Sequence, residues 1–259
     1  MSNIVGAKLI GSTSVTEYAV NGHSIKVLGE NHLSGYESCR PGIPTITVAD
    51  FFLSGAKQAK LLLEVAPGYI DSCPLIGSKN IADIYKAIVA AGYRNKLEGF
   101  DTRSILLRSI DQDVLYHKPS QLSTLKADTI ASIFVYPISR ENQINNILVP
   151  NKNDYRDRGQ YEFLRHSFIN DLVSHCNHII SALTLWEVPS NHSIIVTMIR
   201  DLWKKFSDFS LLCSIFRSKT DLIILCGEKH AENLRIVLKS SIKSQSFPLV
   251  DGCINLCIR

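Results

Sequence analysis

The sequence predicts an α/β protein with a mostly parallel sheet, flanking helices and a helical insertion in the middle of the chain. Short apolar segments alternate with amphipathic helical segments before about residue 103 and again after about residue 221. The segments 61–63 and 222–226 are apolar throughout, which is typical of parallel strands buried on both faces. Between about 110 and 215 the alternation is replaced by long amphipathic segments. We therefore expect one domain over residues 1–259, with a mainly helical insertion at about 110–215.

A hairpin and then alternating helices and strands are predicted in the first part of the chain. Residues 15–20 and 24–28 are β-prone and flank Asn21-Gly22, a dipeptide typical of two-residue hairpin turns. The elements that follow are a helix from Thr45 to about 60, a strand at 61–63, a helix from Asn80 to Gly92 and a strand at 97–100.

The remaining elements are predicted from the same patterns. Residues 104–116 can be helical, 130–136 fit either a strand or a helix, and the polar segment 140–159 is expected to be a surface loop or a lid. The pattern then predicts helices at 160–186 and 191–209, a strand at 221–226, a helix at 231–242 and a last strand at 253–258.

Composition limits the classes of partner and compartment. The chain has 259 residues, a formal net charge of +4, 45% apolar residues and 20% charged residues, which is ordinary for a globular protein. The basic residues do not gather into a stripe, so we expect no nucleic-acid partner. No apolar segment is long enough to span a membrane, and the N-terminus does not resemble a signal peptide. Seven scattered cysteines indicate reduced thiols and a cytoplasmic location.

Two matched motifs are the most informative feature of the sequence. Segments 29–32 and 227–230 both read Gly-Glu-x-His, and each follows a predicted strand. In an open α/β sheet, ligands bind beyond the carboxyl ends of the strands. We therefore expect Glu30, His32, Glu228 and His230 at one edge of the sheet.

Two more predicted strands end in titratable residues. Glu64 follows the strand at 61–63, and Asp101 follows the strand at 97–100, with Arg103 two residues later. A carboxylate left buried without a partner is costly, so a metal ion, an arginine or a histidine should accompany Glu64. Polar residues commonly follow a buried strand, where the chain returns to solvent. This simpler explanation accounts for any one of these titratable residues considered alone.

These four segments together resemble the erythromycin-esterase/ChaN-like proteins and the related TraB/Tiki family. Residues 28–32 resemble the first element of that group, 62–65 the second, 98–103 the third and 225–230 the closing element. The resemblance implies an α/β fold in which two histidine-bearing loops face one cleft. It also implies either hydrolase activity, as an esterase or a metal-dependent peptidase, or haem binding, for which the sequence offers no decisive Tyr or Cys ligand.

The residue types fit hydrolysis of an ester or amide bond in a small-molecule or peptide substrate. His32, Glu64 and His230 can bind a divalent ion such as Zn²⁺, Mn²⁺ or Co²⁺ and leave positions open for water. Without a metal, His32 would act as general base, oriented by Glu30 or Glu64, while Arg103 or His230 stabilises the oxyanion. We favour the metal-dependent version. The alternative is a non-enzymatic binding or structural module that retains the hydrolase-like fold.

Two weaker candidates have simpler explanations. Asp171, His175 and His178 share a stripe on a predicted helix and could hold a metal, but histidine is common beside the apolar face of a helix. Cys226 could be a nucleophile, but a cysteine within an apolar strand is usually an unreactive core residue.

Overall fold

The computed structural model describes residues 8–10, 12–30, 45–55, 58–72, 79–140, 144, 151–246 and 254–255. The chain divides into two compact units. The first contains residues 1–100 and 218–259, and the second contains residues 101–217. The predicted insertion at about 110–215 therefore falls within the second unit.

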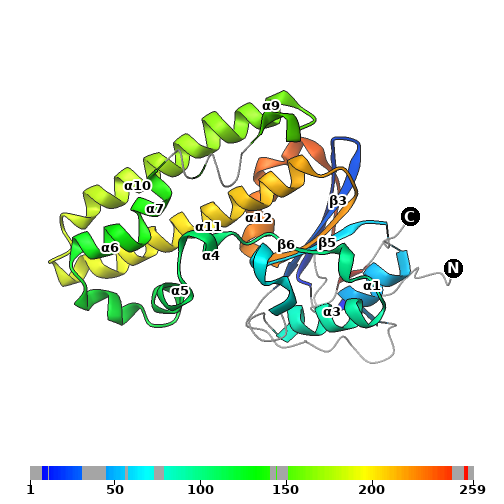
Figure 1. Ribbon diagram of the computed structural model, residues 1–259, viewed down its shortest axis with the longest axis horizontal. Helices are drawn as coiled ribbons and strands as arrows, with labels where there is room; N and C mark the ends of the chain where they lie inside the picture. Colours follow the sequence, from blue (N-terminus) through cyan, green and yellow to red (C-terminus); the bar gives the residue numbers. More distant parts are fainter. Residues whose placement is uncertain are drawn as a thin grey trace. The chain divides into compact units, whose positions relative to one another are not determined.

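A six-stranded sheet forms the centre of the first unit (Figure 1). Its spatial order is β6-β5-β7-β3-β2-β8. The strands are β2 (Ser14–Val20), β3 (His23–Glu30), β5 (Lys60–Leu63), β6 (Leu97–Gly99), β7 (Leu222–Gly227) and β8 (Ile242–Ser246).

Four of these strands are parallel, which confirms the predicted α/β class. β5 pairs in parallel with β6 and β7, and β7 pairs in parallel with β3. β2 and β8 complete the sheet in antiparallel pairings. All six residues of β7 are buried, as expected for a strand covered on both faces.

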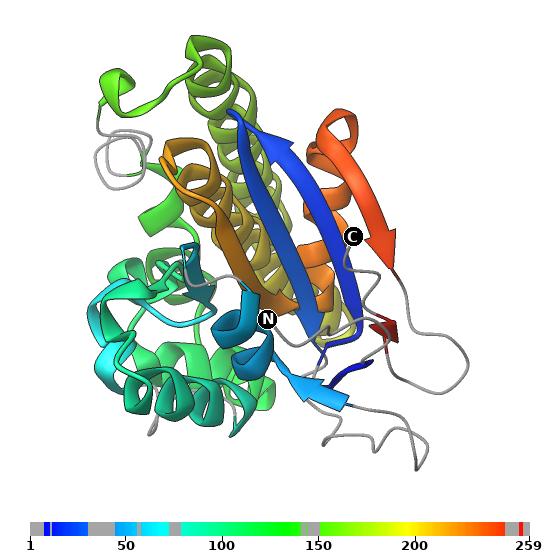
Figure 2. The same cartoon turned by 90° about the vertical axis from the view of Figure 1, so that its right-hand side faces the viewer.

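Helices of the first unit cover the sheet. α1 (Val48–Gly55) and α3 (Lys79–Ala90) contribute to a core that also contains Leu61, Leu63, Ile223 and Leu225. α12 (Glu228–Val237) contacts β2, β3 and β7, and Figure 2 shows it behind the long strands β2 and β3. Since side chains alternate along a strand, neighbouring residues such as Leu62 and Ile224 belong to the opposite face.

The predicted hairpin turn is confirmed. β2 and β3 pair from Ser14↔Gly29 to Val20↔His23, and the connection is Asn21-Gly22. Both residues have positive φ, 54° for Asn21 and 81° for Gly22. Asparagine and glycine tolerate this conformation best, so the dipeptide determines where the chain reverses.

The first helix begins later than the sequence predicts. The prediction places its cap at Thr45, whereas residues 45–47 form the short strand β4 and the helix begins at Val48. The Asp50 amide donates to Thr47 Oγ1 at 3.1 Å, and the Asp50 carboxylate accepts hydrogen bonds from the Thr47 amide and hydroxyl. Thr47 and Asp50 thus satisfy each other reciprocally, as in a capping box, and this pair sets the start of α1.

The last predicted helix is displaced in the opposite direction. α12 begins at Glu228 rather than at 231, so the second Gly-Glu-x-His motif lies on the first helical turn, with Gly227 as its N-cap. The helix ends at Val237, before the predicted end at about 242, and residues 242–246 form β8, which pairs with β2. The prediction missed β8 because its pairing with β2 depends on contacts far away in the sequence.

A second, small sheet also belongs to the first unit. β1 (Lys8–Ile10) pairs in parallel with β4 (Thr45–Thr47) and antiparallel with β9 (Ile254–Asn255). The predicted last strand at 253–258 is therefore confirmed only at residues 254 and 255. The other residues of that prediction lie outside the part of the chain that the structure describes.

The second unit is helical, as predicted. Its segment at 130–136, for which the sequence left two possibilities, is mostly helix. The α-helices are α4 (Arg103–Leu106), α5 (Ser109–Tyr116), α6 (Ala127–Phe134), α7 (Tyr136–Ser139), α9 (Arg158–Glu162), α10 (Ile169–Leu183) and α11 (His192–Arg217). A π-helical segment, Phe163–Phe168, joins α9 to α10, so the helical path continues to residue 183 as the apolar stripe predicts. Of the predicted loop or lid at 140–159, residues 141–143 and 145–150 lie outside the described residues.

Within the described residues, no helix combines the length and apolarity needed to cross a membrane.

Candidate functional site

The site begins at the edge of the sheet where the parallel strands end. Glu30, the last residue of β3, is in register with Gly227, the last residue of β7. On the other side of β7, Leu63 is in register with Leu225, so Glu64 follows directly at the same edge. The strand order therefore brings segments 29–30, 64 and 227–230 together, although they are far apart in the sequence.

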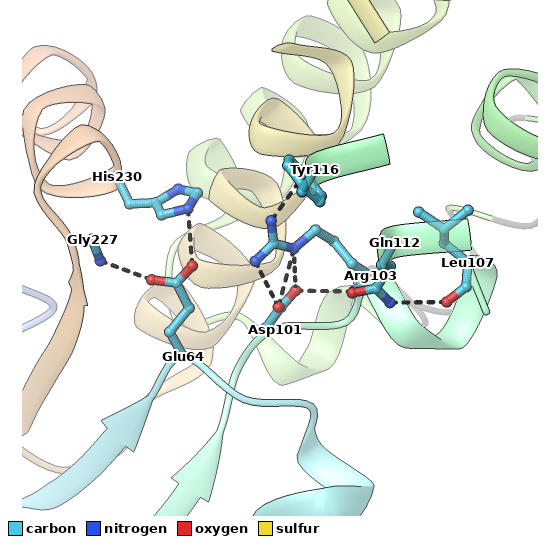
Figure 3. A network of polar contacts seen from close by, with 8 residues as sticks. All are labelled: Glu64, Asp101, Arg103, Leu107, Gln112, Tyr116, Gly227 and His230. Carbon is cyan, nitrogen blue, oxygen red and sulfur yellow. Dashed lines mark hydrogen bonds and ion pairs between the residues drawn. The ribbon is translucent and has the colours of Figure 1, made fainter. Parts of the chain in front are cut away.

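His230 and Glu64 form the centre of this site (Figure 3). His230 Nε2 lies 3.3 Å from Glu64 Oε1, and the exposed fraction of each side chain is 8%. The Gly227 amide donates to the other carboxylate oxygen, Oε2, at 2.7 Å. The Glu64 carboxylate therefore lies at the N-terminus of α12, where the helix dipole favours a negative charge.

This pair confirms the prediction that the Glu64 carboxylate has a partner. The carboxylate at the end of β5 was expected to be accompanied by a metal ion, an arginine or a histidine, and in the structure it contacts His230 of the second motif. When the imidazole is protonated, the attraction between the two groups is strong because little water screens them. Removing one member of such a pair takes a partner away from a buried polar group, which is costly.

Glu30 is held at the same edge by a residue that belongs to neither Gly-Glu-x-His motif. Glu30 is buried, and its Oε2 accepts a hydrogen bond from the Asn80 side-chain amide. Asn80 is the second residue of α3, and the sequence indicated it only as the start of that helix. No pattern in the sequence connects Asn80 with Glu30, because the contact depends on how α3 packs against the sheet.

Glu228, the acidic residue of the second motif, points to β2. Its Oε2 accepts hydrogen bonds from Thr13 Oγ1 and Ser14 Oγ, both at 2.6 Å, and its Oε1 accepts one from Arg235 Nη2 at 2.7 Å. Burial raises the pKa of the Glu228 carboxyl, but these hydrogen bonds and the charge of Arg235 lower it by more, so its net pKa lies below the ordinary value. A catalytic role for Glu228 stays a prediction.

Asp101 and Arg103 form a separate network in the second unit (Figure 3). Asp101 Oδ2 accepts from Arg103 Nη2 at 2.8 Å, and Oδ1 accepts from Arg103 Nε at 2.9 Å. Arg103 Nη1 also donates to the Tyr116 hydroxyl at 3.3 Å, and the guanidinium lies over the Tyr116 ring. Asp101 and Arg103 therefore form an ion pair with each other, while their predicted catalytic roles stay untested.

His32, the histidine of the first motif, lies outside the described residues. Of the three predicted metal ligands, His32, Glu64 and His230, the structure therefore describes only Glu64 and His230. In the described ranges, no three His, Cys, Asp or Glu side chains gather closely enough to hold a metal ion.

The described donors are nevertheless compatible with a shared cation. Two ligand atoms that each lie about 2.1 Å from a tetrahedral Zn²⁺ are about 3.4 Å apart. The separation of His230 Nε2 and Glu64 Oε1 is 3.3 Å. An imidazole nitrogen and a carboxylate oxygen are also ordinary zinc ligands.

The weaker candidates are explained by local structure. Asp171 pairs with Lys205 Nζ at 2.6 Å, which places a cation where a metal would have to bind. Burial and the charge of Lys205 lower the pKa of His175. Cys226 is fully buried within β7, as expected for a core cysteine.

In comparisons with known proteins, the chain matches no family model, no curated protein and no solved structure. The resemblance to the erythromycin-esterase/ChaN-like and TraB/Tiki proteins therefore remains a prediction from four short segments.

Proposed function

We propose that the protein is a hydrolase of ester or amide bonds, with His230 and Glu64 as its reactive pair. The observation that carries the proposal is the 3.3 Å contact between His230 Nε2 and Glu64 Oε1 at the carboxyl ends of parallel strands. Ligands of open α/β sheets bind at this edge. A histidine paired with a carboxylate is also a common arrangement for proton transfer.

His230 would take a proton from the attacking water and deliver a proton to the leaving alcohol or amine. Glu64 would stabilise the positively charged imidazole formed between these two transfers. The Gly227 amide fixes Glu64 in place by a 2.7 Å hydrogen bond, so the carboxylate need not rearrange when the charge develops.

A divalent ion belongs to a second version of the proposal, in which His230 and Glu64 act as metal ligands instead of as an acid–base pair. His230 and Glu64 would hold it together with His32, the third ligand that the motif suggests. Such an ion would supply Lewis acidity and lower the pKa of a bound water. The support for this version is the donor chemistry of the pair and the separation of its two atoms.

The second candidate is a binding or structural module in which His230 and Glu64 are simply a buried ion pair. The low exposure of both side chains, 8% each, favours this candidate. A buried pair of this kind can be retained without any catalysis.

Hydrolysis assays on variants of the pair distinguish the two candidates. The purified protein would be tested on p-nitrophenyl esters and peptide p-nitroanilides, with and without added Zn²⁺, Mn²⁺ or Co²⁺, and its metal content would be measured. We expect His230→Asn and Glu64→Gln to lower kcat/KM by at least about 100-fold, the usual contribution of a general acid–base group. The matched control is His166→Asn, because His166 pairs with Glu162 in an exposed His–Glu contact.

Each outcome has a defined meaning. Activity that requires a metal, with metal content lost in both variants, supports the metal-dependent hydrolase. Activity without metal supports the metal-free mechanism. Absence of hydrolysis on the whole panel, with no bound metal and a folded protein, would overturn the proposal in favour of the module.

A further inference from the structure

We propose that Glu228 is a positioning residue for the reactive pair: it clamps the first turn of α12 to β2 so that His230 faces Glu64. This inference rests on the proposed function, because it concerns the geometry of the same pair. It gives Glu228 a role different from that of Glu30, although both occupy the same position in a Gly-Glu-x-His motif.

The clamp consists of several hydrogen bonds to one carboxylate. Thr13 and Ser14 hydroxyls donate to Glu228 Oε2 at 2.6 Å each, and Arg235 donates to Oε1 at 2.7 Å. Arg235 Nη1 also donates to Ser14 Oγ at 3.2 Å. Glu228 and Arg235, about two turns apart on α12, thus both form hydrogen bonds with Ser14. These two contacts restrict rotation of the helix about its axis.

The strand order explains how one helical turn can reach both sides of β7. β7 continues directly into α12, with β3 and then β2 on one side and β5 on the other. Residues two positions apart on a helix differ by about 200° in direction. Glu228 therefore crosses β3 to reach Ser14 of β2, while His230 reaches Glu64 at the end of β5.

Gly29 provides the space for this crossing. A Cβ atom at Gly29 would lie 2.1 Å from Glu228 Oε2 and 2.5 Å from Ser14 Oγ. Any side chain there would displace the carboxylate from its hydrogen bonds. The Glu228 carboxylate of the second motif therefore packs directly against Gly29 of the first motif, and this contact connects α12 with β3.

A spectroscopic experiment on the full-length, metal-free protein tests the role. The Nε2–H proton of His230 would be followed by long-range ¹H–¹⁵N NMR, and its exchange with solvent would be measured. Glu64→Gln removes the carboxylate and defines the signal of the ring without this contact. We expect Glu228→Gln to accelerate exchange by about tenfold, as when one charge-assisted hydrogen bond is lost near a locally opening site.

Two further variants keep the test decisive. Thr13→Val removes a single donor, should fold even if Glu228→Gln does not, and should change the exchange in the same direction by a smaller factor. Glu232→Gln, on the same helix but in an exposed pair with Lys229, should leave the His230 signal unchanged.

The outcomes separate this inference from the proposed function. If the His230 signal depends on Glu64 but is unchanged in both Glu228→Gln and Thr13→Val, Glu228 only stabilises the fold and the positioning role is wrong. If these variants alter the signal while the wild type hydrolyses nothing, the positioning role stands and the hydrolase proposal fails.

Discussion

Gly99 lies against the backbone of the segment that follows β5. A Cβ atom at this position would lie 2.4 Å from the carbonyl oxygen of Val65 and 2.8 Å from that of Ala66. Backbone atoms cannot move aside as a side chain can, so the close packing of β6 beside Val65 and Ala66 depends on the missing side chain. Glu64 immediately precedes this segment, and the packing at Gly99 therefore helps to define where the carboxylate stands.

Replacement of Gly99 by alanine should destabilise the first unit. We expect Gly99→Ala to lower the free energy of unfolding by about 1–3 kcal/mol, the usual cost of forcing an extra carbon into a packed site. Chemical denaturation monitored by circular dichroism would measure it. Gly68→Ala is the matched control, since nothing lies within 4 Å of a Cβ atom there. Equal stability of the two variants would contradict the close contact.

At the scale of elements, a polar contact joins three short segments of the first unit. Asp71 lies in the 3₁₀ helix Pro67–Ser72, Tyr85 in α3 and Arg94 in the 3₁₀ helix Arg94–Lys96. The Asp71 carboxylate accepts from Arg94 Nη2 and from the Tyr85 hydroxyl, both at 2.8 Å. Hydrogen bonds from Arg94 and Tyr85 lower the pKa of Asp71 to about 2.

This contact should make the stability of the protein depend on pH in acid. Because the folded-state pKa is depressed, the contact stabilises the folded state above the pKa of the unfolded carboxyl, about 3.9. The stabilisation is lost as the pH falls toward about 2. We expect Arg94→Gln to raise the pKa of Asp71 toward its ordinary value, as measured by NMR titration of the carboxyl group. Lys96→Gln serves as the control, and an unchanged Asp71 titration in Arg94→Gln would show that the guanidinium is not its main partner.

At the scale of the whole molecule, the sheet combines two stretches of sequence that the second unit separates. β3, β5 and β6 precede residue 101, whereas β7 follows residue 217. β7 nevertheless lies between β3 and β5 and pairs with both. The first unit can therefore complete its sheet only after the whole second unit has been synthesised.

A truncated chain tests this arrangement. A protein that ends at Arg217 lacks β7, so we expect the amides of β3 and β5 to lose their protection from hydrogen exchange. A protein that ends at Ser246 retains β7, α12 and β8 and should keep this protection. Protected β3 and β5 amides in the shorter protein would mean that these strands do not require the central strand.

The sequence alone was sufficient for the fold class and for several local features, because these depend on neighbouring residues. The alternation of apolar strands with amphipathic helices predicted the parallel sheet, and Asn21-Gly22 predicted the hairpin turn through its tolerance of positive φ. The motif at 227–230 and the acidic end of the strand at 61–63 identified His230 and Glu64 as candidates. The predicted start of α1 was wrong, because Thr47 rather than Thr45 caps the helix.

Only the tertiary structure decided which candidates meet and what each contacts. Strand order and register are not encoded in local patterns, and they alone bring Glu64 of β5 to His230 of α12. The same long-range packing pairs Asn80 with Glu30 and directs Glu228 to Thr13 and Ser14. Two motifs that share the pattern Gly-Glu-x-His thus have different surroundings, because each side chain is placed by the strands beside it rather than by its own sequence.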